Sequence, residues 1–110
     1  MPNLFADIPV DLPEELFETL LEASSVKIER IVSRGHASPP DFWYDQEQDE
    51  WVIVLQGEAG LAFADQEGEL TLRPGDYVLI KAHAKHRVTF TAPDRDTIWL
   101  AVFLNSDNQG

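Results

Sequence analysis

The chain has 110 residues, enough for one small domain with a single core and too few for separate cofactor and substrate domains. Hydrophobic residues make up 44% of it and charged residues 25%, the mixture of an ordinary globular protein. The formal net charge of −12 repels phosphate backbones and anionic lipid headgroups. We therefore expect neither a nucleic-acid partner nor binding to a membrane.

Cysteine is absent from the sequence, which removes disulfides, thiolate nucleophiles and zinc fingers. The longest apolar runs, such as residues 51–55, are far shorter than the roughly 18–20 residues that a membrane helix needs. The acidic N-terminal region lacks the basic segment of a secretory signal peptide. We expect a cytoplasmic protein in which His, Asp, Glu or neutral oxygen atoms would hold any metal ion.

The first 25 residues predict a helical segment that packs on the rest of the chain. Asp11 is a candidate helix cap with Glu14 three residues later, and Pro13 suits a first helical turn. The apolar residues that follow have helical spacing: Leu16, Phe17, Leu20 and Leu21. We expect a short amphipathic α-helix over residues 13–21 that ends near residues 23–25.

From residue 26 onward the sequence changes to short β-type segments separated by turn clusters. Such segments, without helices between them, predict an antiparallel sandwich or barrel rather than a parallel α/β sheet. We place the barrel domain at residues 26–104 and a disordered polar tail at residues 105–110. The expected strands are 26–32, 42–45, 50–56, 59–64, 69–72, 77–80, 87–91 and 97–104.

The segment of residues 51–55 is apolar on both faces. Trp51 and Ile53 point to one side of the predicted strand, whereas Val52 and Val54 point to the other. A strand without a polar face must be covered on both sides. The cover is either the predicted N-terminal helix or a second subunit, and we expect a homodimer.

Two segments carry a family resemblance. Residues 72–86, Leu-Arg-Pro-Gly-Asp-Tyr-Val-Leu-Ile-Lys-Ala-His-Ala-Lys-His, resemble the second cupin motif, in which a Pro-Gly-Asp turn starts a strand that leads to an inward His. Residues 49–57, Asp-Glu-Trp-Val-Ile-Val-Leu-Gln-Gly, resemble the end of the first cupin motif. The chain is thus similar to small single-domain bacterial cupins of the RmlC-like superfamily. The resemblance implies an all-β antiparallel double-stranded β-helix, or jelly roll, here with a short N-terminal α-helix.

Two residues match metal ligands of that family. A cupin metal centre usually takes two His from a His-x-His, one Glu and the His of the second motif, and Glu50 and His86 stand at the last two positions. The resemblance therefore implies a divalent metal ion in the barrel mouth. Mn, Fe, Ni and Zn are the candidates, and no nucleotide cofactor is expected.

The His-x-His pair itself is missing. Counting back from Glu50, it would fall either at residues 43 and 45 or at residues 44 and 46, and neither choice supplies a histidine. We therefore name Asp45 as a third metal ligand, helped by His83, which stands where the family usually has Gly. Such a carboxylate-rich centre favours Mn or Fe(II). In the plainer alternative, His86 is a structural histidine and His83 a surface loop residue.

Three functions stay open at this level. The first is a metal-dependent cupin that binds an oxygen-rich small molecule in the barrel mouth, with isomerase, oxygenase or lyase chemistry. The alternative is a metal-free binding or sensor module in which Phe42, Tyr44 and Trp99 line an aromatic pocket, although aromatic residues also build ordinary cores. The third is a role in assembly that uses the two-sided apolar strand. The sequence leaves both an enzyme and a binding protein open.

Overall fold

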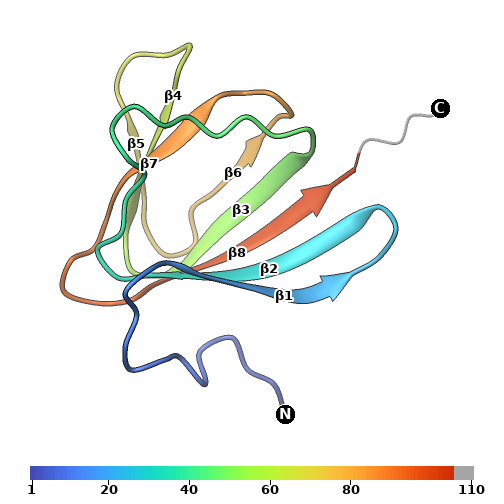
Figure 1. Ribbon diagram of the computed structural model, residues 1–110, viewed down its shortest axis with the longest axis vertical. Coiled ribbons are helices and arrows are strands. Elements are labelled where there is room, and N and C mark those ends of the chain that lie inside the picture. The colour runs from blue at the N-terminus through green and yellow to red at the C-terminus, as the bar shows by residue number, and fades with distance from the viewer. Residues whose placement is uncertain (106–110) are drawn as a thin grey trace.

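The computed structural model describes residues 1–105, and it consists of two antiparallel sheets (Figure 1). One sheet has five strands in the order β1-β2-β8-β3-β6, and the other has three in the order β5-β4-β7. The predicted all-β double-stranded β-helix is confirmed. The strands are β1 (Leu16–Glu22), β2 (Val26–Ser33), β3 (Asp49–Gln56), β4 (Ala59–Phe63), β5 (Leu70–Leu72), β6 (Tyr77–Ile80), β7 (His86–Thr91) and β8 (Thr97–Leu104).

The prediction of an N-terminal α-helix is wrong, because residues 16–22 form strand β1 and no helix occurs within residues 1–105. β1 pairs antiparallel with β2 from Leu16↔Val32 to Glu22↔Lys27, with an irregularity between Thr19 and Leu21. A helix of about nine residues is marginal by itself in water. The ladder with the β-branched strand β2 satisfies the same backbone groups and leaves Leu16 and Glu18 half-buried. Consequently these residues form a strand paired with β2, although the spacing of their leucines also fits a helix.

The segment of residues 42–45 is also not a strand. It pairs with the barrel at an isolated bridge, Tyr44↔His86, at the start of β7. By contrast, β6 and β8 begin and end where the sequence predicts. Residues 106–110 of the expected tail lie outside the described part of the chain. The described residues contain no helix long and apolar enough to cross a membrane.

The core lies between the two sheets and follows the alternation of the strands. In β3 the side chains of Val52 and Val54 are 2% and 0% exposed, whereas their neighbours in the strand are half-buried on the outer face. The turn after β3 depends on Gly57, which has a φ of +90°. A Cβ atom there would lie 2.6 Å from the Cα of Thr97, so this turn packs tightly against β8.

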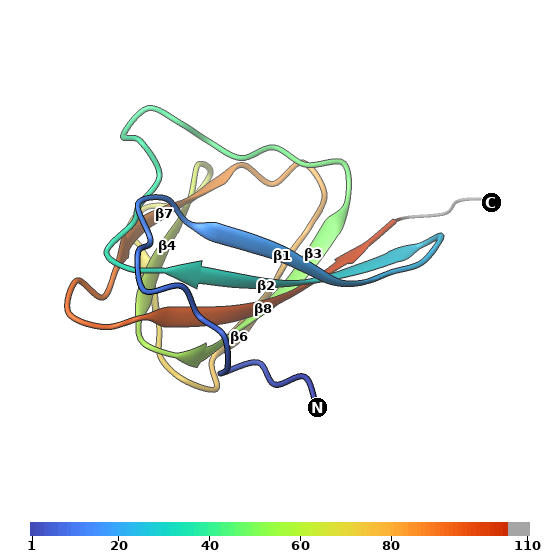
Figure 2. The same cartoon turned by 60° about the horizontal axis from the view of Figure 1, so that its bottom comes forward.

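The N-terminal segment, residues 1–14, crosses the outer face of the five-stranded sheet before it enters β1 (Figure 2). Arg30 of β2 is buried beneath this segment and donates hydrogen bonds to the carbonyl oxygens of Leu4 and Ala6 at 3.0 and 2.7 Å. It also forms an ion pair with Glu18 of β1. A buried guanidinium is tolerated here because a carboxylate and two carbonyl groups surround it.

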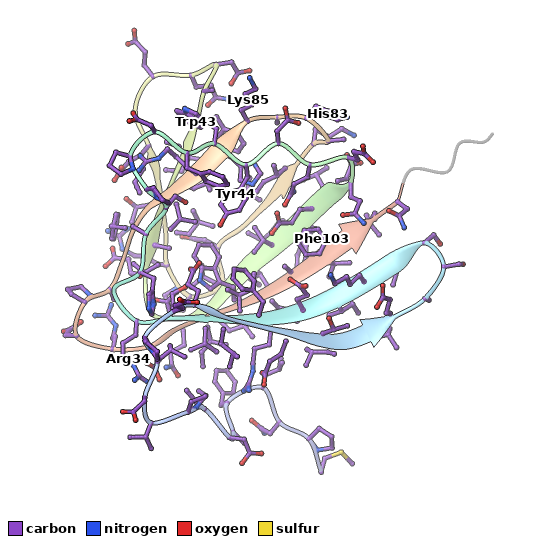
Figure 3. The ribbon with its side chains drawn as sticks, viewed as in Figure 1. Arg34, Trp43, Tyr44, His83, Lys85 and Phe103 are labelled. Atoms are coloured by element: carbon purple, nitrogen blue, oxygen red, sulfur yellow. The ribbon has the colours of Figure 1, made fainter. Side chains whose placement is uncertain are left out.

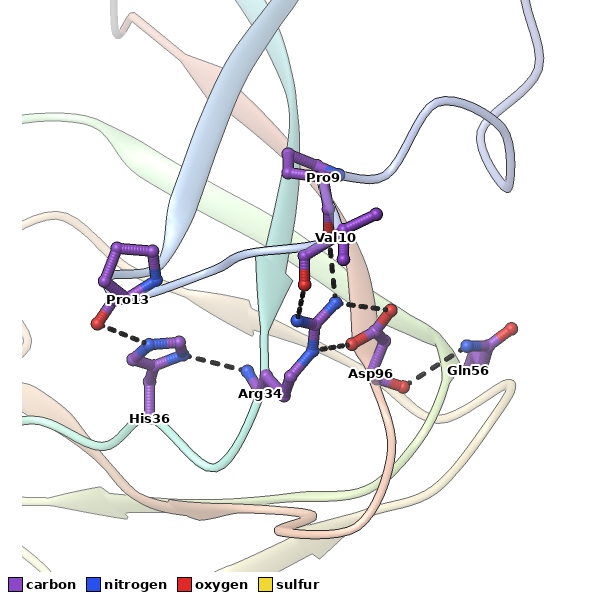
Figure 4. Close-up of polar contacts among 7 residues, drawn as sticks. All are labelled: Pro9, Val10, Pro13, Arg34, His36, Gln56 and Asp96. Atoms are coloured by element: carbon purple, nitrogen blue, oxygen red, sulfur yellow. Dashed lines mark hydrogen bonds and ion pairs between the residues drawn. The ribbon is translucent and has the colours of Figure 1, made fainter.

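A second basic side chain fastens the same segment nearer to β1 (Figure 4). Arg34 pairs with Asp96 through two hydrogen bonds of 2.6 and 3.3 Å. His36 accepts a hydrogen bond from the Arg34 backbone N–H at Nδ1, so its Nε2 carries the proton that it donates to the segment. The carbonyl oxygens that accept from Arg34 and His36 belong to Pro9, Val10 and Pro13. Hydrogen bonds from Arg34 and His36 therefore hold the N-terminal segment in place where it leads into β1.

Part of the outer face of the five-stranded sheet remains apolar and exposed. Trp51 of β3 packs against Tyr77 of β6, with ring centroids 5.3 Å apart. Tyr77 is 65% exposed and Leu79 is 47% exposed. The helix that was expected to cover residues 51–55 is absent, so the second subunit is the remaining predicted cover.

Candidate ligand pocket

A cavity of about 80 Å³ lies inside the barrel and is lined by residues from both sheets. Most of its wall is apolar, with side chains such as Ile31 and Leu61. The polar groups in the wall are few, and most come from the strand β3, the start of β7 and the segment before β3. They are Glu15, Tyr44, Gln46, Glu50 and His86.

Glu50 and His86 form the buried polar centre of this cavity. Glu50 shares the inward face of β3 with Val52 and Val54 and is 7% exposed, while His86 begins β7 and is 4% exposed. The His86 Nε2 atom lies 3.9 Å from Glu50 Oε1, beyond direct hydrogen-bond distance. The side-chain amide of Gln46 donates to the same Glu50 oxygen at 3.2 Å.

Burial sets the protonation of this pair. It raises the pKa of Glu50 to about 7, with the nearby Glu29 acting in the same direction and the Gln46 hydrogen bond opposing it. It lowers the pKa of His86, against the effect of the Ala84 carbonyl. His86 Nδ1 lies 2.8 Å from that carbonyl oxygen, which can only accept, so Nδ1 carries the proton. Near neutral pH, Glu50 exchanges a proton easily and His86 Nε2 presents a free lone pair to the cavity.

Tyr44 closes one side of the cavity. Its backbone N–H donates to the His86 carbonyl oxygen at 2.7 Å, and the His86 N–H donates back at 3.1 Å. This bridge stacks the two rings with centroids 5.5 Å apart, and Tyr44 points toward the barrel interior (Figure 3). Burial raises the pKa of the Tyr44 phenol, which therefore stays protonated. Trp99 also lines the cavity, whereas Phe42 lies outside it, 44% exposed and edge-on to Tyr44.

The other two predicted metal ligands lie outside the cavity, on the rim. Asp45 Oδ1 and His83 Nδ1 are 2.8 Å apart, and both side chains are exposed. His83 has a φ of +66°, the left-handed conformation that favours Gly, which is the residue the family usually has there. Its backbone N–H donates to the Gln46 carbonyl oxygen at 2.7 Å. Asp45 and His83 thus join two loops, and the structure does not bring them to Glu50 and His86.

The donor set of the cavity does not fit a resident divalent metal ion. Of the two possible positions for the His-x-His, residues 44 and 46 face the cavity, and they supply a phenol and an amide. At the ligand positions of the family only Glu50 and His86 are strong donors, and such ions usually require at least three. Within residues 1–105, no group of three or more His, Cys, Asp or Glu residues is placed to hold a metal ion.

Sequence reasoning missed several residues of the cavity. Glu15, which immediately precedes β1, and Phe17 within β1 line it from a segment that was expected to be helical. The Ser33 hydroxyl donates to Glu15 Oε2 at 2.5 Å and accepts from Trp99 Nε1 at 3.2 Å, which fixes this second carboxyl group. The two-residue spacing of Glu15 and Phe17 is the signal of a shared strand face that could have identified them.

Comparison with known proteins agrees with this architecture. The family model of the Cupin domain matches residues 30–103. The structure of a putative mannose-6-phosphate isomerase from Ralstonia eutropha JMP134 is 49% identical, covers 96% of this chain and 98% of its own, and has a TM-score of 0.93.

Two more distant structures share the fold. A cupin superfamily protein from Desulfitobacterium hafniense DCB-2 is 23% identical, with coverages of 90% and 84% and a TM-score of 0.72. An RmlC-like cupin with a double-stranded β-helix from Methanocaldococcus jannaschii is 20% identical, with coverages of 90% and 87% and a TM-score of 0.69. No curated protein matches the chain. The domain match and the 49% identity over almost the whole length show that this chain belongs to the cupin family.

Proposed function

We propose that this cupin binds a small molecule in the barrel cavity and does so without a resident metal ion. The observation that carries the proposal is the buried Glu50–His86 pair, which faces a cavity with mostly apolar walls. A few convergent polar groups in an apolar pocket are typical of ligand sites. Here they are two hydrogen-bonding groups without the further donors that a metal ion needs.

The volume limits the ligand. A cavity of about 80 Å³ has roughly half the volume of an apolar cavity of about 150 Å³ that holds benzene. It therefore encloses only a few non-hydrogen atoms, and a larger ligand must extend through the mouth. Proton transfer is the chemistry that Glu50 would supply, because a group with a pKa of about 7 both donates and accepts near neutral pH.

The name of the Ralstonia relative suggests a sugar phosphate, but the cavity does not favour one. A phosphate group is usually held by Arg, Lys or a helix N-terminus. None of the described residues that line the cavity is Lys or Arg, and the chain carries a net charge of −12. We therefore propose a ligand without a phosphate group.

The first experiment measures metal content and binding on the same sample. We expect less than one-tenth of a metal ion per chain by plasma mass spectrometry, even after incubation with Mn, Fe(II), Ni and Zn followed by desalting. We also expect probes of five or six non-hydrogen atoms (n-butylamine, 1-butanol and butanoate) to shift amide NMR signals of cavity residues in the presence of EDTA.

Variants make the test specific. Glu50→Gln and His86→Ala should change probe binding, whereas His83→Ala, which alters an exposed histidine on the rim, should leave it unchanged. One metal ion per chain that is lost in both cavity variants would overturn the proposal and restore the predicted metal centre. Absence of binding by all three probes would also contradict it.

A further inference from the structure

The Glu50–His86 pair indicates which polar group the ligand presents. The two side chains come from different sheets, on β3 and β7, and meet inside the barrel. We infer that the ligand carries a hydroxyl group on an aliphatic chain, and that the hydroxyl oxygen lies between His86 Nε2 and the Glu50 carboxyl group. This inference rests on the proposed small-molecule binding and names the class of ligand.

His86 offers a hydrogen-bond acceptor to the cavity. Its Nδ1–H donates to the Ala84 carbonyl oxygen at 2.8 Å, so the lone pair is on Nε2. No N–H or O–H group of residues 1–105 lies within hydrogen-bond distance of Nε2, and His86 is buried. A buried acceptor is costly to leave without a donor. A ligand that brings a donor therefore gains at this atom.

The other side chains with nitrogen atoms in the cavity wall already have partners on the protein. Trp99 Nε1 donates to the Ser33 hydroxyl at 3.2 Å, and the Gln46 amide donates to Glu50 Oε1 at the same distance. His86 Nε2 is therefore the wall nitrogen that a ligand can satisfy. An ether or ketone oxygen only accepts hydrogen bonds, so it would leave this atom without a donor.

Glu50 provides the second contact. Its Oε1 atom lies 3.9 Å from His86 Nε2, which is too far for a direct hydrogen bond and close enough for one atom to bridge the two. An oxygen about 2.8 Å from Nε2 can also lie about 2.8 Å from Oε1. A hydroxyl oxygen suits this place, because it donates to His86 and accepts from the protonated form of Glu50. An ammonium nitrogen has no lone pair with which to accept the second bond.

The strand register places apolar side chains next to this pair. Glu50 is paired with Ile80 of β6 and with Phe103 of β8, and Val88 lies two residues after His86 on β7. All three apolar residues line the cavity, so an alkyl chain attached to the hydroxyl group leaves water against them. An anion would meet the Glu50 carboxyl group instead of a basic side chain, since none of the described residues in the wall is Lys or Arg.

The test compares 1-butanol with methyl propyl ether by amide NMR titration. These isomers have the same molecular formula, and only the alcohol has an O–H group. We expect 1-butanol to bind about three- to tenfold more tightly, which corresponds to one net hydrogen bond. If no acceptor met the O–H group, 1-butanol would instead bind more weakly than the ether, because it would lose a hydrogen bond to water. The nitrogen NMR signal of His86 Nε2 should shift with 1-butanol and not with the ether.

Two matched variants locate the contact of the hydroxyl group. His86→Asn keeps an N–H group that can donate to the Ala84 carbonyl oxygen but has no acceptor in place of Nε2. The preference for 1-butanol should therefore disappear in this variant. His83→Asn makes the same replacement at the exposed rim, where the φ of +66° suits Asn, and it should keep the preference.

Each outcome decides a different point. If the ether binds as tightly as 1-butanol, or n-butylamine binds and 1-butanol does not, the hydroxyl inference is overturned while small-molecule binding stands. If none of these probes binds, both fail. A preference for 1-butanol that persists in His86→Asn would mean that the O–H group binds elsewhere and would also overturn the inference. Should His86→Asn fail to fold, the comparison of the isomers and the His86 nitrogen signal in wild type still carry the test.

Discussion

The buried carboxyl group of Glu50 should make the stability of the protein fall as pH rises. In the unfolded chain, Glu50 ionises near its ordinary pKa of 4.5, whereas burial raises its folded-state pKa to about 7. The folded state therefore holds a proton that the unfolded state loses between pH 4.5 and 7, which favours unfolding as pH rises. Each unit of difference between the two pKa values corresponds to about 1.4 kcal/mol. The free energy of unfolding therefore falls by about 3 kcal/mol in total, and the fall is complete above pH 7.

Glu50→Gln removes this ionisation but keeps the size and the hydrogen-bonding capacity of the side chain. Relative to wild type, the free energy of unfolding of the variant should rise by about 3 kcal/mol between pH 4.5 and 8. Urea unfolding followed by tryptophan fluorescence at several pH values measures it. The lowered pKa of His86 destabilises the fold at acid pH in both proteins. This effect cancels when the variant is compared with wild type at the same pH.

Glu67→Gln is the control, because Glu67 is exposed and its replacement makes the same change in net charge. Its stability relative to wild type should vary with pH by less than about 0.5 kcal/mol. If Glu50→Gln and wild type lose stability in parallel from pH 4.5 to 8, the assignment of Glu50 as a buried acid is refuted. The proton-transfer role proposed for it would fall with it.

Two further predictions concern the turn after β3 and the outer sheet face. Gly57→Ala should lower the free energy of unfolding by at least about 2 kcal/mol more than Gly68→Ala: both glycines have positive φ, but a Cβ meets Thr97 only at Gly57. Equal losses in urea unfolding would contradict this. Wild type should be a dimer by light scattering after gel filtration, and Leu79→Glu should give monomers, because a charge on the exposed apolar face opposes association. A monomeric wild type would remove the predicted homodimer.

Most strands of the barrel, and the inward position of Glu50, could be predicted from the sequence alone. The Pro-Gly-Asp turn located β6, and strand alternation placed Glu50 inward with Val52 and Val54. These features are local, because a turn or an alternating strand needs only a few consecutive residues. The match to the second motif also predicted that His86 points inward, and the structure places it beside Glu50.

The errors arose where the structure depends on distant partners. The leucine spacing in residues 16–22 fits a helix as well as a strand, and only pairing with β2 decides between them. The spacing from Glu50 also left two candidates for the inward pair. One pair is residues 43 and 45, and the other is residues 44 and 46. That segment is not a strand, and its orientation is set by the bridge between Tyr44 and His86 and by the contacts of Asp45 and Gln46 with His83.

The fastening of the N-terminal segment has a practical consequence for the boundaries of this domain. Residues 30–103 match the family, yet Glu15 and Phe17 of the cavity wall precede them. Arg30 and Arg34 hold the preceding segment through its carbonyl oxygens, so they determine how the chain enters β1 and reaches Glu15. A protein trimmed to the family match would keep Glu50 and His86 but would open the cavity on the side of the second carboxyl group. The wall of the cavity therefore includes residues that the family match does not cover.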